Sequence, residues 1–264
     1  MSLGLLALSI AAGAQDDRGG SIRVAPPWQQ PEPEPAEAWE TGFIKGEFAF
    51  VRIRYDTRFG SGRGFGRGTW AIDFPDADTN FLRGVSRLTN IQVKPEPVQL
   101  RLDDDRIFDY PFLYGLEMGQ GGGIFLSPRE IENLREYLLR GGFLLIDDFW
   151  GTEEWRNFYN TFGEIFPDRE LVELKSDHEI FHCFYDIDGP QMILALMSNG
   201  PEKDVDEPYN YAILDDDGRV MVLINWNSDM GDGWEHTYHP AYPTKLANLA
   251  YQLGINYLIY ALTH

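Results

Sequence analysis

The sequence predicts an α/β domain, a three-layer sandwich in which helices cover both faces of a mostly parallel central sheet. Segments rich in strand-forming residues alternate with segments whose apolar residues have helical spacing, and this alternation favours a parallel sheet. The run FLLI at 143–146 is wholly apolar, which is typical of a parallel strand buried on both faces. From residue 242 onward, the apolar residues predict a C-terminal helix that packs on the sheet: Leu246, Leu249, Leu253, Tyr257 and Tyr260.

Two strands and one helix are predicted in the first part of the domain. Residues 48–55, FAFVRIRY, alternate apolar and polar side chains and are rich in strand formers. A Gly/Arg-rich loop follows at 58–68, and a helix is expected around 78–92. Residues 108–115, FDYPFLYG, predict a second short strand that is buried.

The clearest helix signal begins at Ser127. Ser127, Pro128 and Glu130 supply an N-cap, a proline at the first helical position and a glutamate at the third, which together form a capping box. Gly141 and Gly142 end this helix before the strand at 143–146. One helical face carries its apolar residues: Ile131, Leu134 and Leu138.

A helix and a hairpin are predicted between that strand and the C-terminal helix. The helix should run from Thr152 to about Phe166. Residues 211–226 contain two apolar runs around the turn sequence Asp-Asp-Gly, which predicts a β-hairpin.

The first 41 residues differ in composition from the rest of the chain. Residues 1–14 hold a short apolar segment followed by a small-x-small cleavage pattern, which predicts a secretory signal peptide and a periplasmic or secreted protein. Residues 15–41 are polar and rich in Pro and Glu, so they predict a disordered tether. We expect a single folded domain over 42–264 and no transmembrane span in the mature chain. Cys183 is the single cysteine, so no internal disulfide can form.

The charge of the chain limits its partners. The formal net charge is −20 at pH 7. Nucleic-acid binding depends on clustered Lys and Arg, so no nucleic-acid partner is expected.

Residues 178–182, HEIFH, match the H-E-x-x-H signature of zinc proteases, in which two histidines one helical turn apart bind zinc. Gly189 and Pro190 follow closely, which leaves room for a short helix only. The pattern has no metal-binding continuation, and a third ligand would have to come from elsewhere: Glu235, His236 or His239. We therefore expect an accidental match, with no metal site and no evident cofactor, and a zinc protease is the less favoured alternative.

Two acidic residues stand where open α/β sheets bind their ligands. Asp147 and Asp148 end the central strand, and ligands bind outside the carboxyl ends of such strands. Adjacent strand residues point to opposite sides, so the two are not automatically a catalytic pair. At least one is expected to serve a site, and the other interpretation is a helix cap.

Two polar segments, expected to be loops, each have two possible interpretations. Residues 225–236, NWNSDMGDGWEH, resemble a calcium loop, but Met230 stands where glycine is required. This segment is either a ligand-lining loop or a structural turn. The Gly/Arg-rich loop, which begins at Arg58, is either a surface loop paired with acids or a site for an anionic ligand.

Four segments together resemble a bacterial family, domain-of-unknown-function family 4159: FAFVRIRYD, GGFLLIDDFWG, DHEIFHCFYDIDG and NWNSDMGDGWEH with the C-terminal helix. The resemblance covers roughly 47–264. It implies a class I glutamine-amidotransferase-like, flavodoxin-like fold that is similar to trehalose-utilisation-type proteins. The resemblance also implies that relatives occur as neighbours of envelope proteins with von Willebrand A modules. We therefore expect a cell-envelope protein as a possible partner.

The resemblance also bears on two activities. In amidotransferases the nucleophilic cysteine follows the central strand, whereas Asp147 and Asp148 occupy that place here and Cys183 lies elsewhere. A carboxylate cannot replace a thiolate in glutamine hydrolysis, so glutaminase activity is not expected. Family members commonly carry proline at the position of Glu179, which further weakens the zinc-protease interpretation.

These observations favour an exported amidotransferase-like domain without the cysteine nucleophile, which binds a ligand or protein partner at the carboxyl edge of the sheet. The alternative is a hydrolase, with or without a metal, in which Asp147 or Asp148 works with His178 or His236 as acid and base. The expected lining of the site is Arg58, Asp147, Asp148, His178, Asn225, Asp229, Glu235 and His236.

Overall fold

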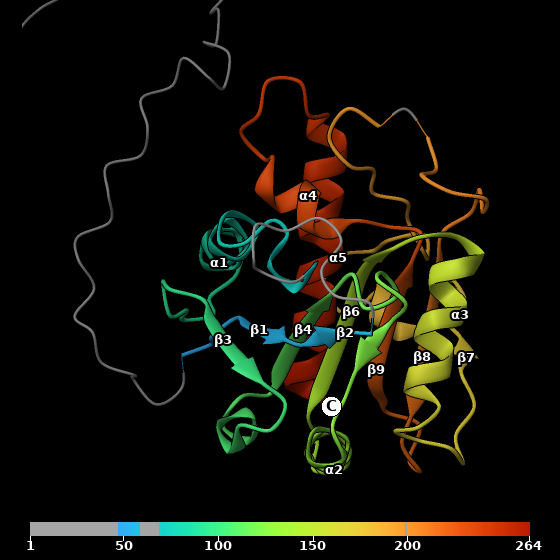
Figure 1. Ribbon diagram of the computed structural model, residues 1–264. Coiled ribbons are helices and arrows are strands. Elements are labelled where there is room, and N and C mark those ends of the chain that lie inside the picture. Colours follow the sequence, from blue (N-terminus) through green and yellow to red (C-terminus); the bar gives the residue numbers. More distant parts are fainter. Residues whose placement is uncertain (1–46, 59–68, 199) are drawn as a thin grey trace, which may run out of the picture. The chain divides into compact units, whose positions relative to one another are not determined.

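The structure is a computed structural model that describes residues 47–58, 69–198 and 200–264 (Figure 1). The predicted signal peptide, the tether and most of the Gly/Arg-rich loop lie outside the described residues. In the part of the chain that is described, no helix is both long and apolar enough to cross a membrane.

A seven-stranded sheet forms the centre of the fold, in the order β3-β1-β4-β6-β9-β8-β7. Five of its strands are joined by parallel pairing: β3 (Val98–Arg101), β1 (Val51–Arg54), β4 (Phe112–Leu116), β6 (Phe143–Phe149) and β9 (Val220–Trp226). Two more strands extend it by antiparallel pairing: β8 (Tyr209–Leu214) and β7 (Val172–Glu173). The predicted mostly parallel α/β fold is therefore confirmed. A separate ribbon pairs β2 (Asp56–Thr57) with β5 (Ile124–Phe125).

Helices cover both faces of this sheet (Figure 1). One apolar core joins the sheet to α1 (Asp76–Leu88), α4 (Met230–Glu235) and α5 (Thr244–Thr263). The other joins it to α2 (Pro128–Leu139) and α3 (Gly151–Phe162). Every residue of β6 is buried between these layers, as its wholly apolar run predicts. Three 3-10 turns complete the described elements: η2 (Thr69–Ala71), η3 (Asp105–Asp109) and η4 (Glu179–Phe181).

Local sequence signals account for most of these elements. The capping box of α2 forms as predicted, because the Ser127 side chain accepts from the Glu130 amide and the Glu130 carboxylate accepts from the Ser127 amide. The predicted hairpin is the antiparallel pair β8–β9. The segment 225–236, expected to be a loop or turn, instead contains the short helix α4.

The order of the parallel strands determines where side chains can meet. Along the sheet they are the second, first, third, fourth and fifth in chain order. The connections that leave the carboxyl ends of the neighbouring strands β1 and β4 therefore go to opposite faces, with α1 on one and α2 on the other, and a crevice opens outside such carboxyl ends.

Candidate functional site

Acidic side chains from the segments that follow the parallel strands gather at the carboxyl edge of the sheet. Candidate metal-ligand atoms of Asp232, Glu235 and His236 lie within 4.8 Å of one another, as do those of Asp73, Asp229 and Asp232. Asp148 acts electrostatically on Asp229. We call this set the acid cluster: Asp73, Asp148, Asp229, Asp232, Glu235 and His236.

Asp147 uses both of its carboxylate oxygens to hold neighbouring elements together. Its Oδ2 accepts hydrogen bonds from the Tyr114 hydroxyl at 2.9 Å and from the amides of Met230 and Gly231 at 2.9 and 3.3 Å. Its Oδ1 accepts one from the Asn225 side-chain amide at 3.1 Å. Asp147 therefore fixes the first turn of α4 to the end of β6.

Asp148 has a different environment from its neighbour. Its backbone lies in the left-handed region, with φ of 53°, and the ladder between β6 and β9 is irregular between Ile146 and Phe149. Such backbone strain in a residue other than glycine is concentrated at functional sites. The Asp148 Oδ1 accepts a hydrogen bond from the Trp150 indole at 2.8 Å.

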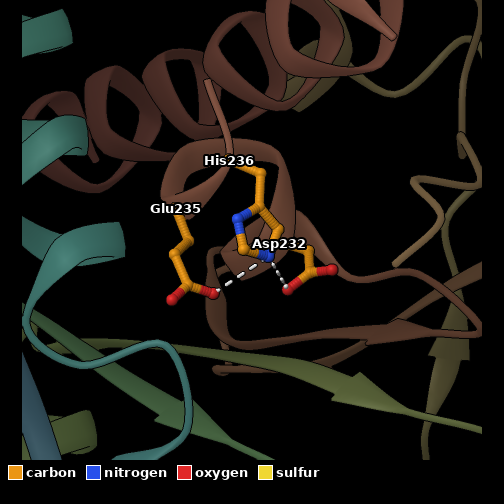
Figure 2. Close-up of side chains that lie close together, drawn as sticks. All are labelled: Asp232, Glu235 and His236. Carbon is orange, nitrogen blue, oxygen red and sulfur yellow. Dashed lines mark ion pairs between the residues drawn. The ribbon is translucent and has the colours of Figure 1, made fainter. Parts of the chain in front are cut away.

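Helix α4 presents three cluster side chains on one side. Asp229 caps the helix, because its Oδ1 accepts from the Asp232 amide at 2.8 Å. Figure 2 shows the His236 imidazole between the carboxylates of Asp232 and Glu235, at 3.5 and 3.3 Å from its Nε2. These residues are at positions i, i+3 and i+4, which share a helical face. Trp234 points to the other side, where the centroid of its ring lies 4.4 Å from the centroid of the Phe81 ring in the core.

Asp73 reaches the cluster because a buried arginine holds the segment before it. The Arg52 guanidinium makes a bidentate ion pair with Asp78 in the first turn of α1. Its Nη1 also donates to the carbonyls of Trp70 and Ile72, at 3.1 and 2.9 Å. Arg52 is fully buried, so its charge is offset mainly by Asp78 and its donors are committed to this clamp.

The cluster concentrates negative charge in a buried place. Burial and then the charge of Asp232 raise the pKa of Asp73 well above its ordinary value. Burial also raises the pKa of Asp148, with Glu117 next, and that of Asp229, with Asp148 next. Burial raises the pKa of Glu235, against the opposing effect of His236. These shifts have one physical cause, since desolvation and like charges both disfavour the ionised form.

Five of the eight expected lining residues lie together in the structure, and a sixth, Asn225, contacts one of them. Asp147, Asp148, Asp229, Glu235 and His236 meet at the carboxyl edge. The side chain of Asn225 holds Asp147 in place, because it donates a hydrogen bond to Asp147 and accepts one from Asn210.

Arg58 and His178 lie away from the cluster. The Arg58 side chain is exposed and faces Glu164, with 3.7 Å between Nη2 and Oε1. The His178 ring lies 6.1 Å from that of Tyr260, whose hydroxyl accepts from the amide of Val220, the first residue of β9. His178 is therefore near the amino end of the parallel strands. There it lines an open hollow of about 450 Å³ together with residues of β7 and the segment after it.

The residues of the H-E-x-x-H match do not form an α-helix. His178 caps the three-residue turn η4, and its Nδ1 accepts from the Ile180 amide at 3.2 Å. His182 lies beyond the other end of this turn, and its ring nitrogens contact Asp186 and the Ser176 carbonyl at 2.5 and 2.6 Å. The two imidazoles are thus committed to separate local contacts.

Two cluster residues were not predicted from the sequence. Asp232 could have been found, because Asp232, Glu235 and His236 have the i, i+3, i+4 spacing of a helical face directly after a strand. Asp73 carries no such signal, since only the fold brings its segment beside α4.

Comparison with protein-family models gives a match that covers most of the described domain. No curated protein matches the chain. The sequence model of one family, described as "Domain of unknown function (DUF4159)", matches residues 49–262.

Proposed function

Because the chain belongs to the DUF4159 family, whose description names no reaction, we propose its function from the geometry: it binds a cationic ligand at the carboxyl edge of the parallel sheet, in the acid cluster. The observation that carries this proposal is the convergence of carboxylates with which no lysine or arginine side chain of the described residues forms an ion pair, and beside which His236 is a group that can carry a positive charge. Among residues 47–58, 69–198 and 200–264, no lysine or arginine forms an ion pair with Asp73, Asp148 or the acids of α4. Uncompensated buried charge is costly, and a bound cation offsets that cost.

The topology supports the same location. Parallel strands in the order second, first, third, fourth, fifth are typical of flavodoxin-like folds, in which ligands bind outside the carboxyl ends at the point where the strand order reverses. Here Asp73 follows β1 and Asp148 ends β6. We therefore include a flavodoxin-like, amidotransferase-like fold in the proposal.

Glutamine hydrolysis is not part of the proposal. Asp147 and Asp148 stand at the end of the central strand, where amidotransferases carry their cysteine. Cys183 lies near α5, where its thiol donates to the Asn256 carbonyl at 3.2 Å. Burial raises the pKa of this thiol, which disfavours the nucleophilic thiolate. Export to the periplasm or beyond, and a cell-envelope partner, also remain proposals, supported by residues 1–41 and the family resemblance.

A second candidate function is a hydrolase at the same place. His236 favours it, because an imidazole beside two carboxylates can act as a general acid or base. Of the four residues considered for this role, Asp148 and His236 remain available. Asp147 is committed to four donors, and His178 lies at the other end of the strands.

Thermal denaturation with charged probes tests the binding proposal. We expect divalent metal chlorides or small organic amines to raise the Tm of the wild-type chain saturably, and Asp148→Asn to shrink that shift. Glu132→Gln is the matched control, because Glu132 is an exposed carboxylate on α2. No shift with any cationic probe, or an equal shift in Asp148→Asn and wild type, would overturn the proposal.

A further inference from the structure

We propose that the acid cluster holds one divalent transition-metal ion, such as Mn²⁺ or Zn²⁺, between Asp232 and Glu235 of α4 and its C-cap residue His236. Asp73, from the segment before α1, joins this set through Asp232, which belongs to both groups of candidate ligands. This inference rests on the proposed function and names the cation. It assigns the ligands by their geometry.

The three residues of α4 form an open half of a coordination shell. The His236 Nε2 lies between one oxygen of Asp232 and one of Glu235, and all three side chains extend from the same side of the helix (Figure 2). Their candidate ligand atoms lie within 4.8 Å of one another, so a single ion can contact all three. The side chains of His236, Glu235 and Asp232 are 21, 27 and 12 % exposed, which leaves a route for an ion from solvent.

Asp73 provides a second, independent observation at the same place. Its Oδ2 is buried, and no donor among the described residues forms a hydrogen bond with it. A buried acceptor without a partner is energetically costly, so native structures rarely keep one. Burial and the charge of Asp232 disfavour the ionised form of Asp73 most, Arg52 opposes them, and Glu235, which shares a side-chain hydrogen bond with Asp73, adds to them. A cation between these carboxylates would satisfy the orphan oxygen.

The absence of a side chain at Gly231 leaves room for the Asp73 carboxylate against α4. A Cβ on Gly231 would lie 2.4 Å from the Asp73 Oδ2 and 3.3 Å from both the Asp229 Oδ1 and the Tyr114 hydroxyl. Three oxygens thus converge on the place that any larger residue would fill. Asp73 can approach α4 closely only because this residue is glycine.

The donor set selects the class of ion. Three carboxylates and one imidazole suit Mn²⁺, Fe²⁺ or Zn²⁺, which accept nitrogen and oxygen ligands together. Ca²⁺ prefers six to eight oxygen ligands, and Mg²⁺ retains most of its water. Binding should therefore discriminate against both of these hard cations.

The competing interpretation is a charged His236 that pairs with Asp232 and Glu235 without any metal. His236→Lys separates the two, because lysine keeps a positive charge for the ion pairs but, when protonated, has no lone pair for a metal. His239→Gln is the matched control. His239 is the neighbouring exposed histidine, with its ring 5.8 Å from that of His236.

Calorimetric titration of the purified full chain tests the site after treatment with a chelator. We expect one Mn²⁺ or Zn²⁺ per chain, with affinity at least tenfold weaker in His236→Lys and in Asp73→Asn and unchanged in His239→Gln. Circular dichroism and Tm verify that each variant folds. If one of the two cluster variants, His236→Lys or Asp73→Asn, misfolds, the metal affinity of the other tests the site. Absence of metal binding in the wild type, or equal affinity in the cluster variants, would overturn the inference. Stabilisation by organic amines without metal binding would refute the metal site and leave the proposed function standing.

Discussion

Asp147 at the end of β6 accepts a hydrogen bond from the backbone amide of Met230, 83 residues later in the chain, at 2.9 Å. Because Met230 is the first residue of α4, this contact places the helix that carries Asp232, Glu235 and His236. This hydrogen bond thus joins the central strand β6 to the helix that carries the candidate ligands. The two acids of the Asp147-Asp148 pair therefore have different roles: Asp147 positions α4, and Asp148 belongs to the cluster.

Asp147→Ala should destabilise the fold more than Asp148→Ala. It leaves four buried donors without an acceptor: the Tyr114 hydroxyl, the amides of Met230 and Gly231, and the Asn225 side chain. We expect a loss of about 3 kcal/mol or more, since each unsatisfied buried group costs about 1–3 kcal/mol. Urea unfolding of both variants measures the difference. Equal losses in the two would show that Asp147 does not anchor α4.

Stability should depend on pH through Asp147. Burial raises its pKa to about 6, against four hydrogen bonds that lower it. Because the folded pKa is above the unfolded value, this group stabilises the fold fully below about pH 4, and the contribution is lost as pH rises through about 6. Two pKa units correspond to about 3 kcal/mol.

Asp147→Asn provides the comparison for this pH dependence. The amide keeps the volume and one acceptor but does not titrate. In metal-free protein, the free energy of unfolding of the wild type should fall relative to that of Asp147→Asn between pH 4 and 6.5. Parallel curves for the two proteins would contradict the raised pKa.

Arg52 and Asp78 should show strong coupling. Removing one partner leaves the other charge buried, which costs about 3–5 kcal/mol, whereas an apolar replacement of both is much milder. We therefore expect Arg52→Met to be strongly destabilising and the double variant Arg52→Met with Asp78→Leu to recover most of that loss. A double-mutant cycle by urea unfolding measures this, and additive effects would contradict the clamp that positions Asp73.

Glu179→Pro should be tolerated with little loss of stability. Glu179 is exposed and begins the 3-10 turn η4, and within the described residues its amide donates no hydrogen bond. Proline is accepted at such a first position. We expect a Tm close to that of the wild type and unchanged metal affinity. Loss of metal binding in this variant would restore the zinc-protease interpretation.

The sequence predicts the features that depend on local pattern. The apolar run before Asp147, the capping box at Ser127 and the hairpin around the Asp-Asp-Gly turn all appear where expected. The expectation of a candidate site at the end of β6 follows from the same pattern, because parallel strands end at one edge.

The remaining features depend on contacts between distant segments. Helix α4 forms from a segment of glycines and polar residues because Asp229 caps it, Asp147 binds its first amides and Trp234 packs into the core. Asp73 joins the cluster from a segment that the Arg52 clamp holds in place. His178 was expected at the site from its residue type, but the segment after β7 carries it to the amino end of the strands.

Anomalous diffraction from crystals of the full chain grown with Mn²⁺ or Zn²⁺ tests the central claim most directly. The account predicts one strong peak at about 2.0–2.2 Å from oxygens of Asp73, Asp232 and Glu235 and from the Nε2 of His236. A metal peak at His178 and His182, or none at the acid cluster, would contradict it.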